Sequence, residues 1–135
     1  MALQFSTTVR NARLDAIETA IGASAVLKIR TGAAPANCGT ADSGTVLATL
    51  SLPSDYMAAA SGGTKAKSGT WEDLSADAAG TAAHFRLYAS DGTTCHAQGT
   101  VTATGGGGDM TLDNVVLALA QQFTITSFTI TEPNG

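Results

Sequence analysis

The chain has 135 residues, of which 44% are hydrophobic and 13% charged, and its formal net charge is −4. This length is enough for one domain with a buried core and short for two. Because only 7 residues are Lys or Arg and no apolar run reaches the roughly 18 residues of a membrane-spanning helix, we expect neither a nucleic-acid partner nor a membrane contact.

Residues 9–22, VRNARLDAIETAIG, predict a short amphipathic helix near the N-terminus. Ser6 or Thr7 can cap its first amides with a hydroxyl, and Gly22 can take the left-handed conformation that ends a helix. Charged residues in this region interrupt the apolar stretch that a secretory signal peptide needs, so we expect synthesis in a reducing cytoplasm. Apolar residues recur at helical spacing at Val9, Leu14, Ile17 and Ile21.

Residues 1–24 are expected to form an N-terminal arm and helix ahead of the β-domain, and they are locally basic in an acidic chain. Arg10 and Arg13 are three positions apart, so they lie on one helical face, from which we expect them to point outward and bind carboxylates of a partner. Leu3 and Phe5 offer an apolar anchor for the same contact. The alternative is that the helix only covers one end of the domain.

Two strands are predicted after the helix by alternating apolar and polar residues. Residues 25–31 form the first, and residues 46–52 form the second, which Pro53 ends because proline has no amide hydrogen to donate. Between them, residues 32–44 have the composition of a long loop.

The next segment is less regular. Residues 56–63 predict either one helical turn or a loop that two glycines end. Residues 68–74 predict a strand in which Trp71, the single tryptophan, packs on the sheet.

Residues 84–104 have the strongest pattern, an alternation of period two on both sides of an Asp-Gly turn that predicts a β-hairpin. A three-residue loop, 90–92, places apolar residues opposite one another, with Leu87 facing Cys95. Gly92 is then expected in the left-handed conformation.

Four glycines at 105–108 predict a flexible loop where the chain reverses. Residues 110–120 are apolar enough for one strand, although their second half could also be helical. The final apolar pairs change parity, so a slip near Ser127 is needed for all of them to face inward. These residues are Phe123, Ile125, Phe128 and Ile130.

Seven or eight short strands at about ten-residue spacing, without strand–helix alternation, are typical of an all-β domain. We therefore expect a mainly β fold, an antiparallel β-sandwich or jelly roll with a short N-terminal α-helix. Residues 25–135 would form the single β-domain.

No motif predicts catalysis. His84 and His96 are expected on the polar face of the hairpin, with no third ligand spaced to complete a metal site. Neither histidine belongs to a nucleophile motif, so we expect no enzyme activity, no metal and no cofactor. Cys38 and Cys95 are expected to be buried free thiols, with one disulfide as the lesser alternative.

Five segments follow one another along the chain: RNARLDAIETAIG, LKIRTGAAPANC, SGTVLATLSLPSD, AAGTAAHFRLYASDGTTCHAQGTV and QQFTITSFTIT. This order resembles small structural proteins of tailed bacteriophage virions. The resemblance covers nearly the whole chain and implies a decoration or cement protein that binds the major capsid protein on the capsid surface, assembled in the host cytoplasm. It carries no catalytic residues. A homo-oligomer is expected, a dimer first and a trimer next.

An alternative within the same class is a tail-associated or surface carbohydrate-binding β-sandwich of a virion. Sugar binding needs an exposed aromatic platform. The available residues are Tyr56, Trp71 and Tyr88.

Overall fold

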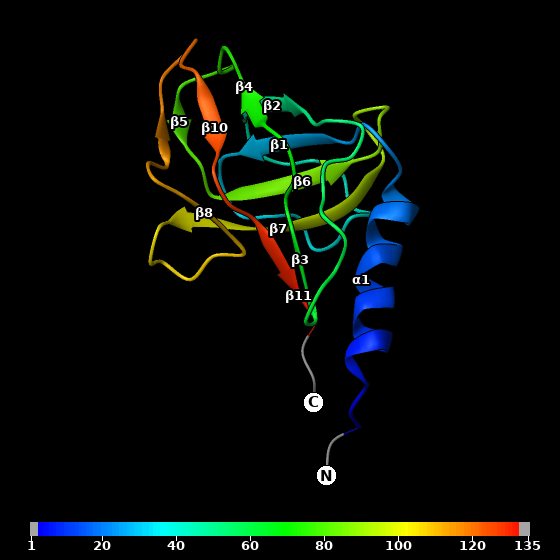
Figure 1. The fold of residues 1–135 in the computed structure, drawn as a ribbon. Helices are drawn as coiled ribbons and strands as arrows, with labels where there is room; N and C mark the ends of the chain where they lie inside the picture. The colour runs from blue at the N-terminus through cyan, green and yellow to red at the C-terminus, as the bar shows by residue number, and fades with distance from the viewer. Residues whose placement is uncertain (1–2, 133–135) are drawn as a thin grey trace.

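The computed structural model describes residues 3–132. It has a mainly β, sandwich-like fold with one N-terminal helix, as the sequence predicts (Figure 1). Within the described range, no helix is long and apolar enough to cross a membrane. The elements are α1 (Thr7–Ile21), β1 (Val26–Arg30), β2 (Val46–Ser51), β3 (Thr64–Ala66), β4 (Trp71–Asp73), β5 (Gly80–Thr81), β6 (His84–Tyr88), β7 (Cys95–Ala103), β8 (Met110–Leu112), β9 (Val116–Leu117), β10 (Phe123–Ile125) and β11 (Thr129–Thr131).

Five strands form the main sheet in the order β2-β1-β6-β7-β8. The strands predicted at 25–31 and 46–52 are confirmed as β1 and β2, which pair antiparallel. Three two-stranded sheets complete the fold: β4 with β10, β3 with β11, and β5 with β9. The first two cross in front of the main sheet in Figure 1, so the β-structure has two layers.

Aromatic rings connect these layers. The ring of Phe128, between β10 and β11, lies 5.8 Å from Trp71 of β4 and 5.6 Å from Phe85 of β6, measured between centroids. Tilted and edge-on pairs at this spacing are favourable contacts. The strand predicted around Trp71 is confirmed, with its indole packed into the core.

The chain turns back at residues 105–108, as predicted, but it turns a second time before β8. β8 runs parallel to β7, with Val101 beside Met110. The Thr102 hydroxyl accepts a hydrogen bond from the amide of Gly108 at 3.0 Å. This bond holds the end of the glycine loop beside Thr102 of β7. β8 therefore starts next to Val101 of β7 and runs in the same direction.

The hairpin of β6 and β7 is confirmed, but its register differs from the predicted one. Tyr88, not Leu87, lies opposite Cys95. Leu87 lies opposite Ala97, because His96 is an extra residue in β7. The apolar residues therefore still face one another near the turn, through a bulge that the alternation alone does not predict.

The turn of this hairpin is longer than three residues because of Asp91. Its carboxylate accepts the amides of Thr93 at 2.8 Å and Thr94 at 2.9 Å. The amide of Ala89 donates to the oxygen of Thr94 at 3.0 Å and closes a four-residue loop. Gly92 has a φ of 70°, the left-handed conformation that was expected of it.

α1 begins and ends at the predicted caps. The Ser6 side chain accepts the amide of Val9, and the amide of Gly22 donates to the oxygen of Glu18. Leu14 is fully buried, whereas Val9 is 41% exposed and does not belong to the buried face. The first turn of the helix extends past the main sheet (Figure 1).

Residues 56–63 are neither a helical turn nor a plain loop. They form one side of an irregular hairpin that leads into β3, with bridges between Met57 and Lys67 and between Ser61 and Thr64. β3 is a strand that the sequence does not predict.

The C-terminal third is more broken than expected. The strand predicted at 110–120 is interrupted and appears as β8 and β9. The slip near Ser127 is present as a break, with β10 pairing with β4 and β11 pairing with β3. The break lets the four apolar residues of this segment reach the core, as expected: Phe123, Ile125, Phe128 and Ile130.

Candidate functional site

The described part of the predicted N-terminal arm is residues 3–24, and its helix lies beside β3 and β11 (Figure 1). Met1 and Ala2 of the predicted arm lie outside the described residues. The expectation that Arg10 and Arg13 point outward holds for Arg13, whose side chain is 52% exposed, but both arginines contact Glu132 of this chain. Arg10 donates from Nε and Nη2 to the Glu132 main-chain oxygen at 3.0 and 2.7 Å, and Arg13 pairs with its carboxylate at 2.7 Å.

A second anchor lies one turn further along α1. The Lys65 ammonium, 2% exposed, pairs with Asp15 at 2.8 Å and Glu18 at 3.0 Å. Asp15 also accepts the amide of Ala60 at 2.9 Å. The hydrogen bond from Lys65, followed by that from Ala60, lowers the pKa of Asp15. Burial alone would lower the pKa of Lys65, but its hydrogen bonds to both carboxylates raise it.

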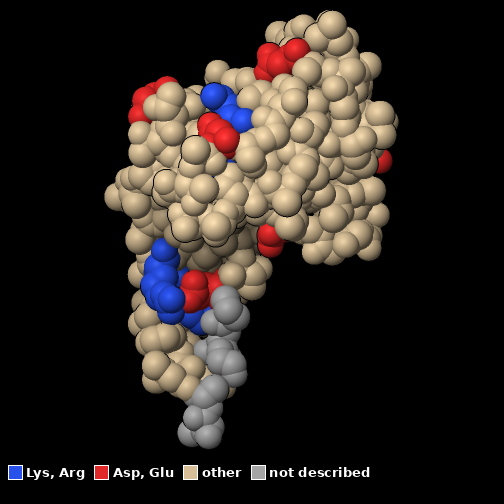
Figure 2. Space-filling view, turned by 180° about the vertical axis from the view of Figure 1, so that it is seen from behind, with Lys and Arg blue, Asp and Glu red and all other residues tan. Residues whose placement is uncertain are grey.

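The outer side of the arm carries two exposed apolar side chains. Leu3 is 77% exposed and Phe5 is 39% exposed. The Arg13 guanidinium lies over the Phe5 ring, 5.2 Å from its centroid. Figure 2 shows basic and acidic side chains gathered where the arm leaves the body, with a second mixed group and separate acidic patches on the body itself. The arm therefore combines a charged anchor on its inner side with an apolar tip.

The predicted aromatic platform is not present. Tyr56, Trp71 and Tyr88 are between 0 and 1% exposed. The indole N–H of Trp71 donates to the main-chain oxygens of Tyr56 at 3.1 Å and Ser68 at 3.2 Å. These rings form the core, because the second layer and the loop after β1 cover the faces that the sequence pattern leaves open.

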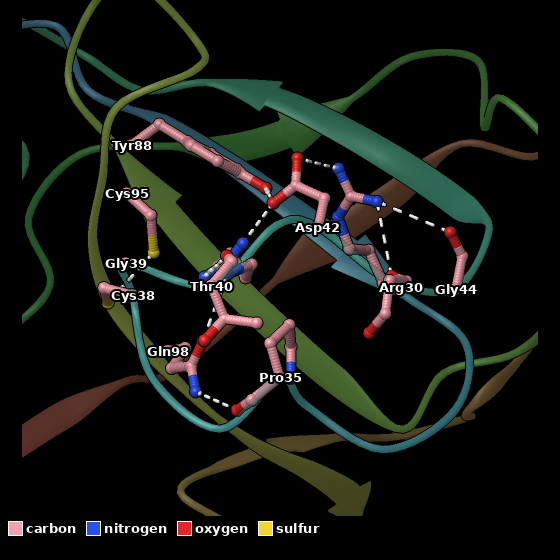
Figure 3. Close-up of polar contacts among 12 residues, drawn as sticks. Arg30, Pro35, Cys38, Gly39, Thr40, Asp42, Gly44, Tyr88, Cys95 and Gln98 are labelled. Atoms are coloured by element: carbon pink, nitrogen blue, oxygen red, sulfur yellow. Dashed lines mark hydrogen bonds and ion pairs between the residues drawn. The ribbon is translucent and has the colours of Figure 1, made fainter.

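The polar face of the main sheet is covered by residues 31–45, the loop between β1 and β2. Because the core covers the other face, all five residues of β6 are buried. Arg86 and Arg30 both bind the carboxylate of Asp42, Arg30 at 2.8 Å, and the Tyr88 hydroxyl donates to the same carboxylate at 2.8 Å (Figure 3). One carboxylate from the loop thus neutralises part of the charge of two buried guanidiniums.

The electrostatics of this polar cluster, Arg30, Asp42, Arg86 and Tyr88, follow from its geometry. Desolvation would raise the pKa of Asp42, but hydrogen bonds from Tyr88 and Arg86 outweigh it and lower the pKa. Burial raises the pKa of Tyr88, and its hydrogen bond to Asp42 adds to the effect. The cluster is a charged clamp for the loop, in which Arg30 Nε is buried without a hydrogen-bond partner.

The two histidines do not share a face. His84 is buried beneath the same loop, with Nδ1 2.7 Å from the Gly32 oxygen and Nε2 buried without a partner. His96 is exposed at the bulge. In residues 3–132 no three His, Cys, Asp or Glu side chains are placed to hold a metal ion.

Two clefts flank α1. One, of about 510 Å³, lies between the helix and residues 54–59 and includes the carboxylates of Asp15, Glu18 and Asp55. The other, of about 410 Å³, lies between the helix, β7 and β11. The Tyr56 hydroxyl is buried without a hydrogen-bond partner, and burial, followed by the charge of Glu18, raises its pKa to about 12. Apolar residues dominate the second lining: Ile17, Ile21, Met57, Phe128 and Ile130.

The sequence pattern identified the arm but missed the clamp. Arg30, Arg86 and Tyr88 alternate with apolar residues, which is typical of a solvated face. One feature of the sequence could have indicated the clamp: the loop that carries Asp42 is long, and a long loop between paired strands is often folded over the sheet. No protein-family model, no curated protein and no solved structure matches the chain.

Proposed function

We propose that this protein is a non-enzymatic structural protein of a bacteriophage virion that decorates the capsid through its N-terminal arm. The observation that carries the proposal is the apolar tip of the arm, where Leu3, Phe5 and Val9 are 77, 39 and 41% exposed. Apolar side chains grouped on a projecting element favour burial against another surface. The order of sequence motifs that resembles virion structural proteins supports the same role.

The ion pairs between the arm and the body of the protein favour binding of a partner, because they order the helix beforehand. Glu132 and Lys65 hold α1 in place through ion pairs. A partner therefore meets a helix that is already ordered, and the entropy cost of association is smaller than for a disordered tail. The partner in this proposal is the major capsid protein. A dimer would engage two lattice positions at once and increase its apparent affinity.

The test is co-sedimentation with empty shells of the major capsid protein encoded in the same genome. The double variant Leu3→Ser/Phe5→Ser removes the apolar tip and keeps the charged residues of both anchors, although it also removes the ring beneath the Arg13 guanidinium. We expect it to bind at least about tenfold more weakly than the unchanged protein, because it loses the burial of two large apolar side chains. The matched control is Leu74→Ser/Leu119→Ser, two leucines that are 70 and 67% exposed outside the arm.

Equal binding of the arm variant and the control would contradict docking through the arm. Failure of the unchanged protein to bind shells would contradict the capsid role itself. The sugar-binding alternative has no structural observation in its favour, since its three aromatic residues are buried.

A further inference from the structure

We propose that Cys38 and Cys95 form an intramolecular disulfide in an oxidising environment and so fasten the loop of residues 31–45 to β7. Both are thiols in the structure, the state expected in a reducing cytoplasm. Yet their sulfurs lie 3.0 Å apart, although 57 positions separate the two residues (Figure 3). Bonded sulfurs are about 2.05 Å apart, so closure requires a movement of only about 1 Å.

The surroundings hold each sulfur in position. Cys95 is in the paired part of β7, opposite Tyr88. On the loop, Arg86 Nη2 donates to the main-chain oxygens on either side of Cys38, to Asn37 at 3.0 Å and Thr40 at 3.1 Å. The two thiols are therefore held together by contacts that do not involve sulfur. Holding reacting groups in this way raises their effective concentration by orders of magnitude.

The oxidant in this proposal is a small disulfide such as oxidised glutathione. The thiolate of one cysteine attacks a glutathione sulfur, forms a mixed disulfide and releases one glutathione thiolate. The second cysteine then attacks the protein sulfur of the mixed disulfide, forms the Cys38–Cys95 bond and releases the second glutathione. The protein loses two protons and two electrons, and one glutathione disulfide becomes two thiols. Both cysteines are partly exposed, so the reagent can reach them.

Reaction at neutral pH should be slow. Burial, followed by the hydrogen bond with Cys38, raises the pKa of Cys95 to about 11, so this residue is a thiol at pH 7. The rate of closure should therefore rise with pH between 7 and 9. This inference is independent of the proposed capsid role, because it concerns the isolated chain.

The experiment uses the full chain, reduced and then equilibrated in glutathione buffers of increasing oxidising potential. Alkylation under denaturing conditions and intact mass measurement count the remaining thiols. We expect no alkylated cysteine and a mass two hydrogens lower at the oxidising end, with the chain still monomeric on a non-reducing gel. The melting temperature should rise by roughly 10 °C, because the bond closes a long loop of the unfolded chain.

Two results would overturn the proposal: two alkylatable thiols at every potential, or disulfide-linked dimers in place of the closed monomer. The double variant Cys38→Ser/Cys95→Ser is the matched control, and its melting temperature should not respond to the glutathione ratio. Amide hydrogen exchange in residues 31–45 should slow on oxidation of the unchanged protein only. Equal slowing in the double variant would count against a cysteine bond as the cause.

Discussion

Lys65 and Asp15 form an ion pair of 2.8 Å across 50 positions of sequence, and this contact joins α1 to β3. Lys65→Met keeps the bulk of the side chain and removes its charge. Asp15 and Glu18 are 47 and 21% exposed, so water can partly replace the ammonium. We expect a loss of about 1–3 kcal/mol in the free energy of unfolding, measured in urea. The control Lys67→Met should cost less than about 1 kcal/mol.

Asp42 is the only carboxylate among residues 3–132 that pairs with Arg30 and Arg86, whose side chains are 7 and 2% exposed. Asp42→Asn leaves two buried guanidiniums without a counter-charge. We expect a loss of about 3–5 kcal/mol in the free energy of unfolding. Faster amide exchange confined to residues 31–45 would locate the effect in the loop. Stability equal to that of the exposed-site control Asp113→Asn would contradict the clamp.

Asp91 makes stability depend on pH in the acid range. The Thr94 hydroxyl, followed by the amides of Thr94 and Thr93, holds the pKa of Asp91 well below its ordinary value of 3.8. The unfolded chain therefore takes up this proton first, and the stabilisation is complete above about pH 4 and lost as the pH falls further. Asp91→Asn should lower the urea midpoint at pH 7. Its difference from the unchanged protein should shrink toward pH 2, and a constant difference would refute the linkage.

Trp71 is the single tryptophan and is 1% exposed, so its fluorescence reports directly on the core. We expect blue-shifted emission that iodide does not quench until the protein unfolds, and no change on addition of sugars. Trp71→Phe leaves the carbonyls of Tyr56 and Ser68 without the indole donor and creates a small cavity. It should cost about 1–3 kcal/mol in the free energy of unfolding. Strong quenching of the native protein would contradict the buried position.

Helices and strands whose signal lies within their own few residues were predictable from the sequence. α1 has a hydroxyl cap at Ser6 and a glycine at its end, and β1 and β2 alternate between apolar and polar residues. The register of the hairpin was not predictable from alternation. It depends on the Asp91 carboxylate, which lengthens the turn, and on Gly99, which lies opposite Phe85. A Cβ atom at Gly99 would lie 2.8 Å from that ring, so only glycine allows the close approach.

The candidate sites, too, could be predicted from the sequence only in part. The exposure of Leu3 and Phe5 agrees with their predicted place on a terminal arm. The partners of Arg10 and Arg86 were not predictable, because Glu132 and Asp42 are distant in sequence and meet them only through the fold. A polar residue on an alternating strand has the same pattern whether water or a folded loop covers it.

The contact between Arg10 and Glu132 also determines when the helix is secured during synthesis. The ribosome adds Glu132 122 positions after Arg10, a delay of roughly 6 to 24 s at about 5–20 residues per second. In that interval the nascent helix can pair with Ala60 and Lys65 and pack its buried face on the core, once these parts have emerged. The end of the helix that carries Arg10 and Arg13 is therefore secured later than the end held by Lys65, and a chain interrupted before Glu132 lacks this anchor.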